Sequence, residues 1–149
     1  MKVFLDTNVV LEVILQREQS AVSKQIVKYM IGKDVAMYIS AASFYTMIFV
    51  TEKYLKKNWG LTGNDKVEAL RIVLEETLKT YSIAEHDNSS LLKGIKDVKF
   101  NDLEDSCQYQ LAQKTGCDLL ITFNPLDYSN AEKKNVEVLT PQQFIEKYA

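Results

Sequence analysis

The run Leu119-Leu120-Ile121-Thr122 decides the fold class of this chain. It is a continuous apolar stretch of strand length, which is typical of a strand covered on both faces within a parallel sheet. The run ends in a polar turn that contains Asn124 and Asp127. Because sites in open parallel sheets form beyond the carboxyl ends of the strands, this turn is a candidate functional position.

Strand-like segments alternate with amphipathic helical segments along the rest of the chain. The other predicted strands cover residues 2–5, 35–39, 80–83 and 136–139. Apolar residues at helical spacing predict helices over residues 9–16, 20–32, 64–78, 87–95 and 103–114, with further helices after Ser40 and from Pro141. This alternation predicts an α/β fold, a three-layer α/β/α sandwich around a mainly parallel five-stranded sheet with right-handed crossovers.

Length and composition set the broad class of protein. With 149 residues, of which 46% are hydrophobic, the chain is expected to form a single domain over residues 1–149. No stretch approaches the roughly 18 consecutive apolar residues of a membrane span, and the apolar start breaks at Asp6, so we expect a soluble, cytoplasmic protein without a membrane partner. Cys107 and Cys117 are interpreted as reduced packing residues. The net charge of -2 excludes a global basic field, so nucleic acid could be contacted only through a local patch.

Three acids open the helix predicted over residues 103–114. They are Asp102, Glu104 and Asp105. Helix capping and the helix dipole are sufficient to explain the presence of about two of these three acids. Helical spacing puts Asp102, Asp105 and Tyr109 on a common face. Taken alone, the cluster is compatible with an ordinary helix start.

An acid elsewhere in the sequence makes a functional interpretation of that cluster more favourable. Asp6 follows the first predicted strand, so it could meet Asp102 and Asp105, together with Asn124 and Asp127, at one edge of the sheet. Carboxylate and amide oxygens suit Mg²⁺ or Mn²⁺, and such ions can assist an in-line phosphodiester displacement. Since the sequence contains no glycine-rich phosphate loop, serine nucleophile elbow or Cys/His pair, metal-assisted hydrolysis is the chemistry these residues best allow.

The roles of several other residues can be interpreted from the sequence in more than one way. Glu12 could reach Asp6, although an ordinary solvated acid is favoured. His86 is interpreted as a loop or cap residue. Residues 53–59 interleave three lysines with two aromatics, which fits either a nucleic-acid contact or, as we favour, the end of an amphipathic helix. Leu91 and Leu92 are expected to pack inward, as is the apolar stripe of residues 64–78.

Four segments, taken in order, resemble the successive motifs of a PIN domain. They are Phe4-Leu5-Asp6-Thr7-Asn8-Val9-Val10-Leu11, Asp102-Leu103-Glu104-Asp105 with Gln108, Gly116-Cys117-Asp118-Leu119-Leu120-Ile121-Thr122-Phe123-Asn124-Pro125-Leu126-Asp127-Tyr128, and Leu139-Thr140-Pro141. The resemblance implies a metal-dependent ribonuclease fold with strand order 3-2-1-4-5. It also suggests the VapC-like toxins of bacterial toxin–antitoxin pairs, and with them an RNA substrate, an antitoxin partner and a homodimer.

The resemblance also assigns site residues. Asp6 matches the first acid of the family, Asp105 the third, and Asn124 falls where many members have the fourth, so these three are the candidate catalytic residues. Asp6, Asp105, Asp102 and Asp127 are the candidate ligands of Mg²⁺ or Mn²⁺. The candidate supporting residues are Thr7, Asn8, Thr46, Glu104 and Thr122.

One family acid is missing. The second acid should fall near Thr46, where no carboxylate stands, and Glu52 lies six residues on, about 600° of helix rotation away. Thr46 could hold a water molecule, or the site could be catalytically silent. A PIN-like domain that binds RNA or protein as a regulator is therefore the alternative function. A receiver-like phospho-acceptor is a third, less favoured one.

Overall fold

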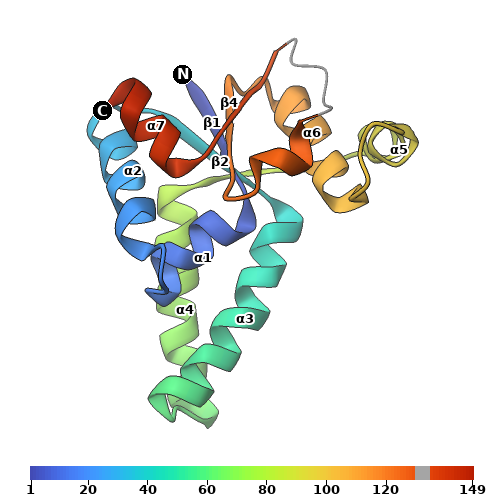
Figure 1. Cartoon of the computed structure of the whole chain (residues 1–149). Coiled ribbons are helices and arrows are strands. Elements are labelled where there is room, and N and C mark those ends of the chain that lie inside the picture. Colours follow the sequence, from blue (N-terminus) through green and yellow to red (C-terminus); the bar gives the residue numbers. More distant parts are fainter. Residues whose placement is uncertain (130–134) are drawn as a thin grey trace.

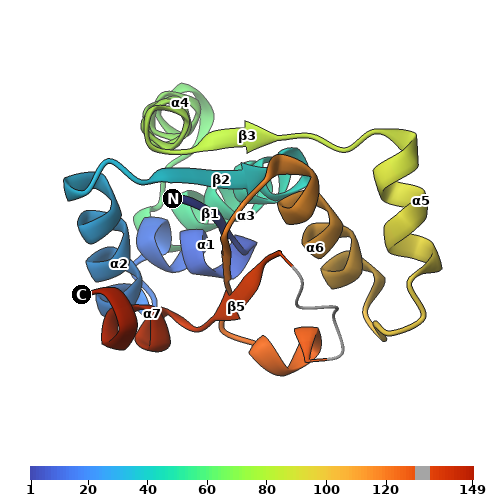
Figure 2. The same cartoon turned by 90° about the horizontal axis from the view of Figure 1, so that it is seen from above.

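The computed structural model describes residues 1–129 and 135–149. In this part of the chain, five strands form one sheet in the order β3-β2-β1-β4-β5 (Figure 2), and each neighbouring pair is parallel. The strands are β1 (Lys2–Leu5), β2 (Ala36–Ser40), β3 (Ser82–Ala84), β4 (Leu119–Ile121) and β5 (Glu137–Leu139). The predicted strand order 3-2-1-4-5 is confirmed.

Helices cover both faces of this sheet, which confirms the three-layer arrangement. Figure 2 shows α5 and α6 on one side, and α1, α2 and α7 on the other. The pair α3 and α4 extends beyond the sheet (Figure 1). The helices are α1 (Thr7–Leu15), α2 (Ser20–Gly32), α3 (Ala41–Trp59), α4 (Gly63–Thr80), α5 (Asn88–Lys96), α6 (Leu103–Thr115) and α7 (Pro141–Tyr148), and a short 3₁₀ helix, η1, covers Pro125–Tyr128.

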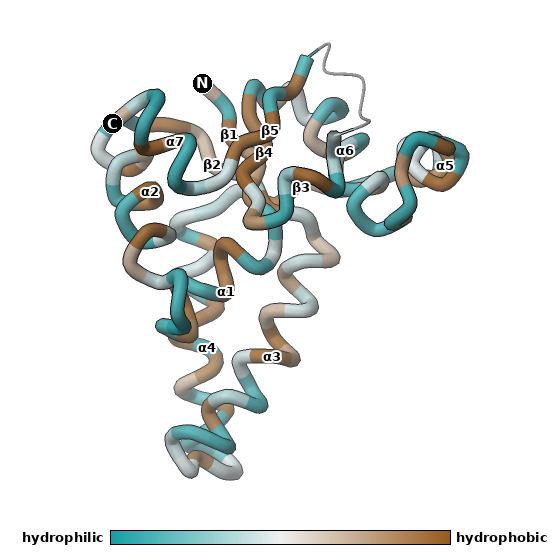
Figure 3. Tube along the Cα trace, in the orientation of Figure 1, coloured by the Kyte–Doolittle hydropathy of each residue, from teal (hydrophilic) through white to brown (hydrophobic). Residues whose placement is uncertain are grey.

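Alternate side chains of the central strands build two cores. Val3 and Leu5 of β1 belong to the core beneath α1, α2 and α7, whereas Phe4 between them belongs to the core beneath α6. Ile121 and Leu120 of β4 divide in the same way. Both faces are therefore apolar, as the continuous apolar runs predict, and Figure 3 shows hydrophobic colour concentrated in these strands.

Local capping fixes where the helices begin and end. The Ser40 hydroxyl accepts a hydrogen bond from the Ser43 amide at the start of α3. Gly116, with φ of 73°, closes α6 in the left-handed conformation that glycine adopts without strain.

Two helices bury less than their sequences predict. Leu78 of α4, and Leu91 and Leu92 of α5, are 50%, 39% and 50% exposed, so the inward packing expected of these leucines is wrong. Leu70, Val73 and Leu74 of α4 are half-buried. The reason is tertiary, because α4 packs mainly on α3 and α5 packs mainly on α6, away from the sheet. In the described residues, none of the helices has the length and apolar character that crossing a membrane requires.

Candidate active site

A cavity of about 410 Å³ opens where β1 ends and α6 begins. Every residue predicted for the site lines this cavity except Thr122, which lies buried behind Asp6. The lining residues are Asp6, Thr7, Asn8, Leu11, Arg17, Thr46, Val50, Asp102, Glu104, Asp105, Gln108, Asn124 and Asp127. Acids that are a hundred residues apart in the sequence therefore share one cavity, which we call the acid cavity.

Asp6 is the most firmly held of these acids. It is only 7% exposed, and its Oδ1 accepts hydrogen bonds from the Thr7 amide at 2.7 Å and from Gln108 Nε2 at 3.1 Å. Its Oδ2 accepts from Thr122 Oγ1 at 2.8 Å. The carboxylate thus caps α1 and is oriented by side chains from α6 and from the end of β4.

Asp102 and Asp105 hold the start of α6. Asp102 Oδ1 accepts a hydrogen bond from the Asp105 amide at 3.1 Å, so Asp102 is the N-cap. The Asp105 carboxylate points into the cavity, and its Oδ1 accepts from the Tyr128 hydroxyl at 3.2 Å. Burial, and then the charges of Asp102, Asp6 and Asp127, raise the pKa of Asp105 to about 6, against the opposing hydrogen bond from Tyr128. A nearby cation would remove this repulsion.

Thr46 stands on the wall of the acid cavity, where the resemblance places the missing acid. Its hydroxyl donates to the Ala42 carbonyl oxygen of its own helix at 3.2 Å. One turn earlier, the buried Ser43 hydroxyl shares a short hydrogen bond with Thr7 Oγ1. Glu52 pairs instead with Lys66 of α4 at 2.9 Å and does not replace the missing carboxylate.

Glu12 is a correction to the sequence analysis. It is 8% exposed rather than solvated, and it does not reach Asp6. Its carboxylate accepts hydrogen bonds from Arg17 Nε at 2.9 Å and from the Gln19 amide at 2.8 Å. The left-handed Gln16, with φ of 51°, turns the chain back so that these donors reach Glu12. Arg17 is thereby brought to the acid cavity, a role that its position in the sequence did not reveal.

Gln108 and Tyr128 are two further residues that the sequence analysis did not assign. Both belong to the quoted motifs, but spacing alone could not show that they hydrogen-bond to Asp6 and Asp105. Tyr109 was expected beside Asp105, yet it is buried against Phe100, with ring centroids 5.8 Å apart. It turns inward because α6 packs this side on the sheet.

The remaining candidates lie away from the acid cavity. His86 precedes α5, where its Nδ1 lies 2.8 Å from Ser90 Oγ, consistent with the predicted loop position. In the run over residues 53–59, Lys53 Nζ lies 4.3 Å from the centroid of the Phe49 ring on the same helix. Leu55 is buried, as expected for the end of an amphipathic helix.

The donor set of the acid cavity fits a hard divalent cation that keeps several water molecules. Across residues 1–129 and 135–149, no three His, Cys, Asp or Glu side chains already form a compact metal-binding group. The available donors are nevertheless all oxygens, and Gln108 Oε1 is buried at the cavity without a hydrogen-bond partner. Mg²⁺ commonly binds through one or two carboxylates with water completing the shell, so the residues suit Mg²⁺ or Mn²⁺.

A parallel sheet of this strand order, with acids at the ends of β1 and at the start of α6, defines a PIN-type fold. The sequence model of the PIN domain matches residues 2–125. The chain also aligns with Ribonuclease VapC1 of Aquifex aeolicus (strain VF5), at 30% identity over 149 residues, covering 99% of this chain and 95% of that protein. This chain belongs to the PIN domain family.

Two solved structures share the fold. One is VapBC2 from Rickettsia felis bound to a DNA fragment from their promoter, with a TM-score of 0.66 and 14% identity over 94% of this chain and 98% of that one. The other is VapBC-1 from nontypeable Haemophilus influenzae, with a TM-score of 0.61 and 12% identity over 95% and 99%. At these identities, the similarity concerns the fold alone.

Proposed function

We propose that this protein is a metal-dependent endoribonuclease and the toxin component of a bacterial toxin–antitoxin pair. The observation that carries the proposal is the convergence of Asp6, Asp102, Asp105 and Asp127 on one cavity. Burial, together with the charges of the other three acids, raises the pKa of Asp105 to about 6. Membership of the PIN family and the similarity to a ribonuclease support it. RNA as substrate makes the cytoplasm the expected location.

In this proposal, Asp6 and Asp105 are the principal ligands of Mg²⁺ or Mn²⁺, with Asp102 and Asp127 as supporting ligands. When bound, the cation would neutralise phosphate charge and acidify water. Gln108 and Thr122 orient Asp6 through the hydrogen bonds described above, and Tyr128 orients Asp105 in the same way. Asn124, which lines the same cavity, completes the catalytic assignment. The supporting roles fall to Thr7, Asn8, Thr46 and Glu104, which line the cavity around these acids.

Arg17 supplies the positive charge of the acid cavity. Among the described lining residues, it is the one cationic side chain. The buried Glu12 binds its Nε, so the guanidinium is oriented while its other nitrogens can donate. A guanidinium held in this way suits a phosphate oxygen of the substrate.

The alternative is a PIN domain that has lost catalysis and binds RNA or protein as a regulator. The observation that favours it is Thr46, which stands in place of an acid with its hydroxyl bonded to its own helix. With fewer carboxylates in the cavity, the affinity for a divalent cation should be lower.

One experiment separates the two functions. Mn²⁺ binding is measured by calorimetry, and RNA cleavage is measured with Mn²⁺ and with a chelator, for the wild type, Asp105→Asn and the control Asp65→Asn on α4. The nuclease proposal expects cleavage that needs the metal, and loss of both binding and cleavage in Asp105→Asn only. An unchanged cleavage rate in Asp105→Asn would refute the site. A folded wild type that neither binds Mn²⁺ nor cleaves RNA would favour the regulator.

We further propose that residues 1–149 act as one domain, as a homodimer, with a protein antitoxin as partner. The two solved neighbours are VapBC assemblies, which supports the antitoxin. Co-expression with the products of adjacent genes should yield a complex in which cleavage is inhibited. If none of these products binds or inhibits the protein, the antitoxin proposal fails.

A further inference from the structure

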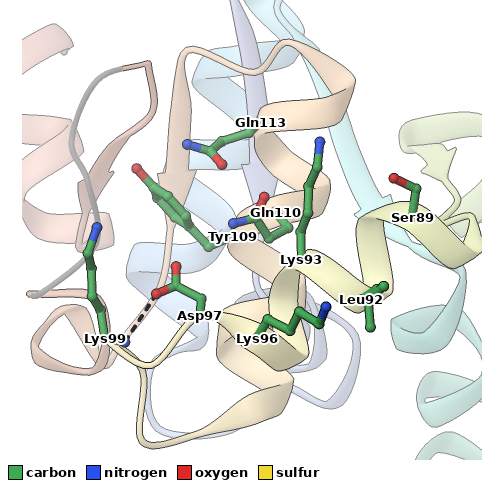
Figure 4. A pocket seen from close by; sticks show the side chains of 9 residues that line it. All are labelled: Ser89, Leu92, Lys93, Lys96, Asp97, Lys99, Tyr109, Gln110 and Gln113. Atoms are coloured by element: carbon green, nitrogen blue, oxygen red, sulfur yellow. Dashed lines mark hydrogen bonds between the residues drawn. The ribbon is translucent and has the colours of Figure 1, made fainter.

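A cavity of about 550 Å³ lies between α5 and α6, apart from the acid cavity. Figure 4 shows that lysines from α5 and polar side chains from α6 border it. Its lining residues are Ser89, Leu92, Lys93, Lys96, Asp97, Lys99, Tyr109, Gln110 and Gln113.

A smaller cavity of about 360 Å³ continues the first. The two share Ser89, Lys93, Gln110 and Gln113. The smaller one is also lined by Lys114 at the end of α6 and by Asp87, whose Oδ2 lies 3.4 Å from Lys114 Nζ. We call the two together the α5–α6 groove. From α6, it is lined by residues of the second half of the helix, from Tyr109 to Lys114.

The α5–α6 groove is positively charged in a protein whose net charge is -2. Lys93, Lys96 and Lys99 line the larger cavity, with Asp97 as its single acid. Lys93 and Lys96 have no ion-pair partner within residues 1–129 and 135–149. Asp97 accepts a hydrogen bond from the Lys99 amide at 3.1 Å, which ties this acid to the backbone (Figure 4). Lys93 and Lys96, which lie beside the amide side chains of Gln110 and Gln113, suit a polyanion.

The acid cavity is lined by the first half of α6 and the groove by the second half, so the two are adjacent along this helix. Lys99 of the groove lies three residues before Asp102, which is the N-cap of α6 and lines the acid cavity. Tyr109 lines the groove, and its ring centroid is 6.3 Å from that of Tyr128, whose hydroxyl binds Asp105. A chain molecule that lies in the groove can therefore reach the acids.

We propose that the α5–α6 groove binds the sugar–phosphate backbone of single-stranded RNA on one side of the cleavage position. The assignment of RNA as the ligand rests on the proposed function, because the strand in the groove would be the same molecule that the acid cavity cleaves. Lys93, Lys96 and Lys99 contact phosphates, and Gln110 and Gln113 donate to phosphate or ribose oxygens. Because these contacts reach no base edge, the groove positions the strand without reading its sequence.

The test measures RNA binding without cleavage. A fluorescent oligouridylate is titrated in a chelating buffer at several salt concentrations, and anisotropy is recorded for the wild type, Lys93→Gln/Lys96→Gln and the control Lys24→Gln/Lys28→Gln. The control removes the same charge from the exposed face of α2. Each lost phosphate contact lowers the salt slope by about 0.7 for a single strand, so the groove variant should lose about 1.4, or about 25-fold in affinity at 0.1 M salt. The control should keep the wild-type slope.

Binding and cleavage results separate the two proposals. If the groove variant binds the oligouridylate like the control, the groove proposal is overturned even where cleavage is intact. If the groove variant loses affinity but the wild type cleaves no RNA, the groove stands and the nuclease proposal fails. Unchanged RNA binding together with lost binding of a polyglutamate peptide would assign the groove to an acidic protein instead. Thermal unfolding measurements on each variant are the control that the substitutions leave the protein folded.

Discussion

The ionisation of Asp105 depends on opposing effects of its neighbours in the acid cavity. Burial and the carboxylates of Asp102, Asp6 and Asp127 disfavour its ionised form, while the Tyr128 hydroxyl favours it. The same neighbours that destabilise the charge in the free protein would share a bound cation. The residue therefore links proton and metal binding.

The pKa of Asp105, raised to about 6, predicts how pH acts on the metal-free protein. The folded state holds this proton more tightly than the unfolded state, so Asp105 should make the protein less stable as pH rises from about 4 to about 6. We expect Asp105→Asn to remove this loss, which thermal unfolding in a chelating buffer would measure. The affinity for Mn²⁺ should instead decrease as pH drops below about 6, because protonated Asp105 binds the cation less well. Identical pH profiles for the wild type and Asp105→Asn would contradict the prediction.

At the scale of elements, α5 and α6 pack closely against each other at Gly94. An added Cβ at Gly94 would lie 2.7 Å from Cys107 Sγ and 2.9 Å from Cys107 Cα. The buried Ser106 hydroxyl donates to the Gly94 carbonyl oxygen at 2.7 Å. The absence of a side chain at Gly94 therefore sets the spacing of the two helices, and with it the width of the α5–α6 groove.

Gly94→Ala is predicted to destabilise the protein by about 1–3 kcal/mol, because the methyl group meets the backbone of α6. The control is Gly32→Ala at the end of α2, where an added Cβ meets nothing within 4 Å. Helix propensity makes that change neutral or stabilising by up to about 1 kcal/mol. Urea unfolding measures both variants. Equal stability of the two would show that α5 and α6 can separate at little cost.

At the scale of the whole molecule, the outer side of α5 leaves an apolar surface uncovered. Leu91 is 39% exposed, Ile95 is 56% exposed and Val98, in the following turn, is 93% exposed. Exposed apolar residues that gather on one element are typical of a protein interface. We expect the proposed homodimer to use this surface, which would put its interface next to the α5–α6 groove.

Ile95→Lys combined with Val98→Lys is predicted to convert the dimer to a monomer, since two charges would be buried without partners. The control Ile31→Lys changes an apolar residue of similar exposure, 59%, on α2. Sedimentation analysis gives the mass of each variant. A dimer that survives the α5 changes but is lost with Ile31→Lys would place the interface on α2.

The sequence by itself determined the layers of the fold and the identities of the acids. Local signals were sufficient there: the apolar run at Leu119 to Ile121 requires burial on both faces, and Asp6 follows a strand end. The strand order came from the resemblance to PIN domains. The extent of the single domain and the roles of Asp105 and Asn124 stay predictions.

Only the tertiary structure decided which side chains meet. Gln108 binds Asp6 across 102 residues of sequence, and Arg17 reaches the acid cavity because Glu12 is buried rather than solvated. Lys93, Lys96 and Lys99 recur at every third residue of the sequence, but only the packing of α5 on α6 places them along one groove with Lys114. Helical and strand periodicity specify which face of an element is apolar, but hydrogen-bond partners and uncovered surfaces depend on how the elements pack against one another.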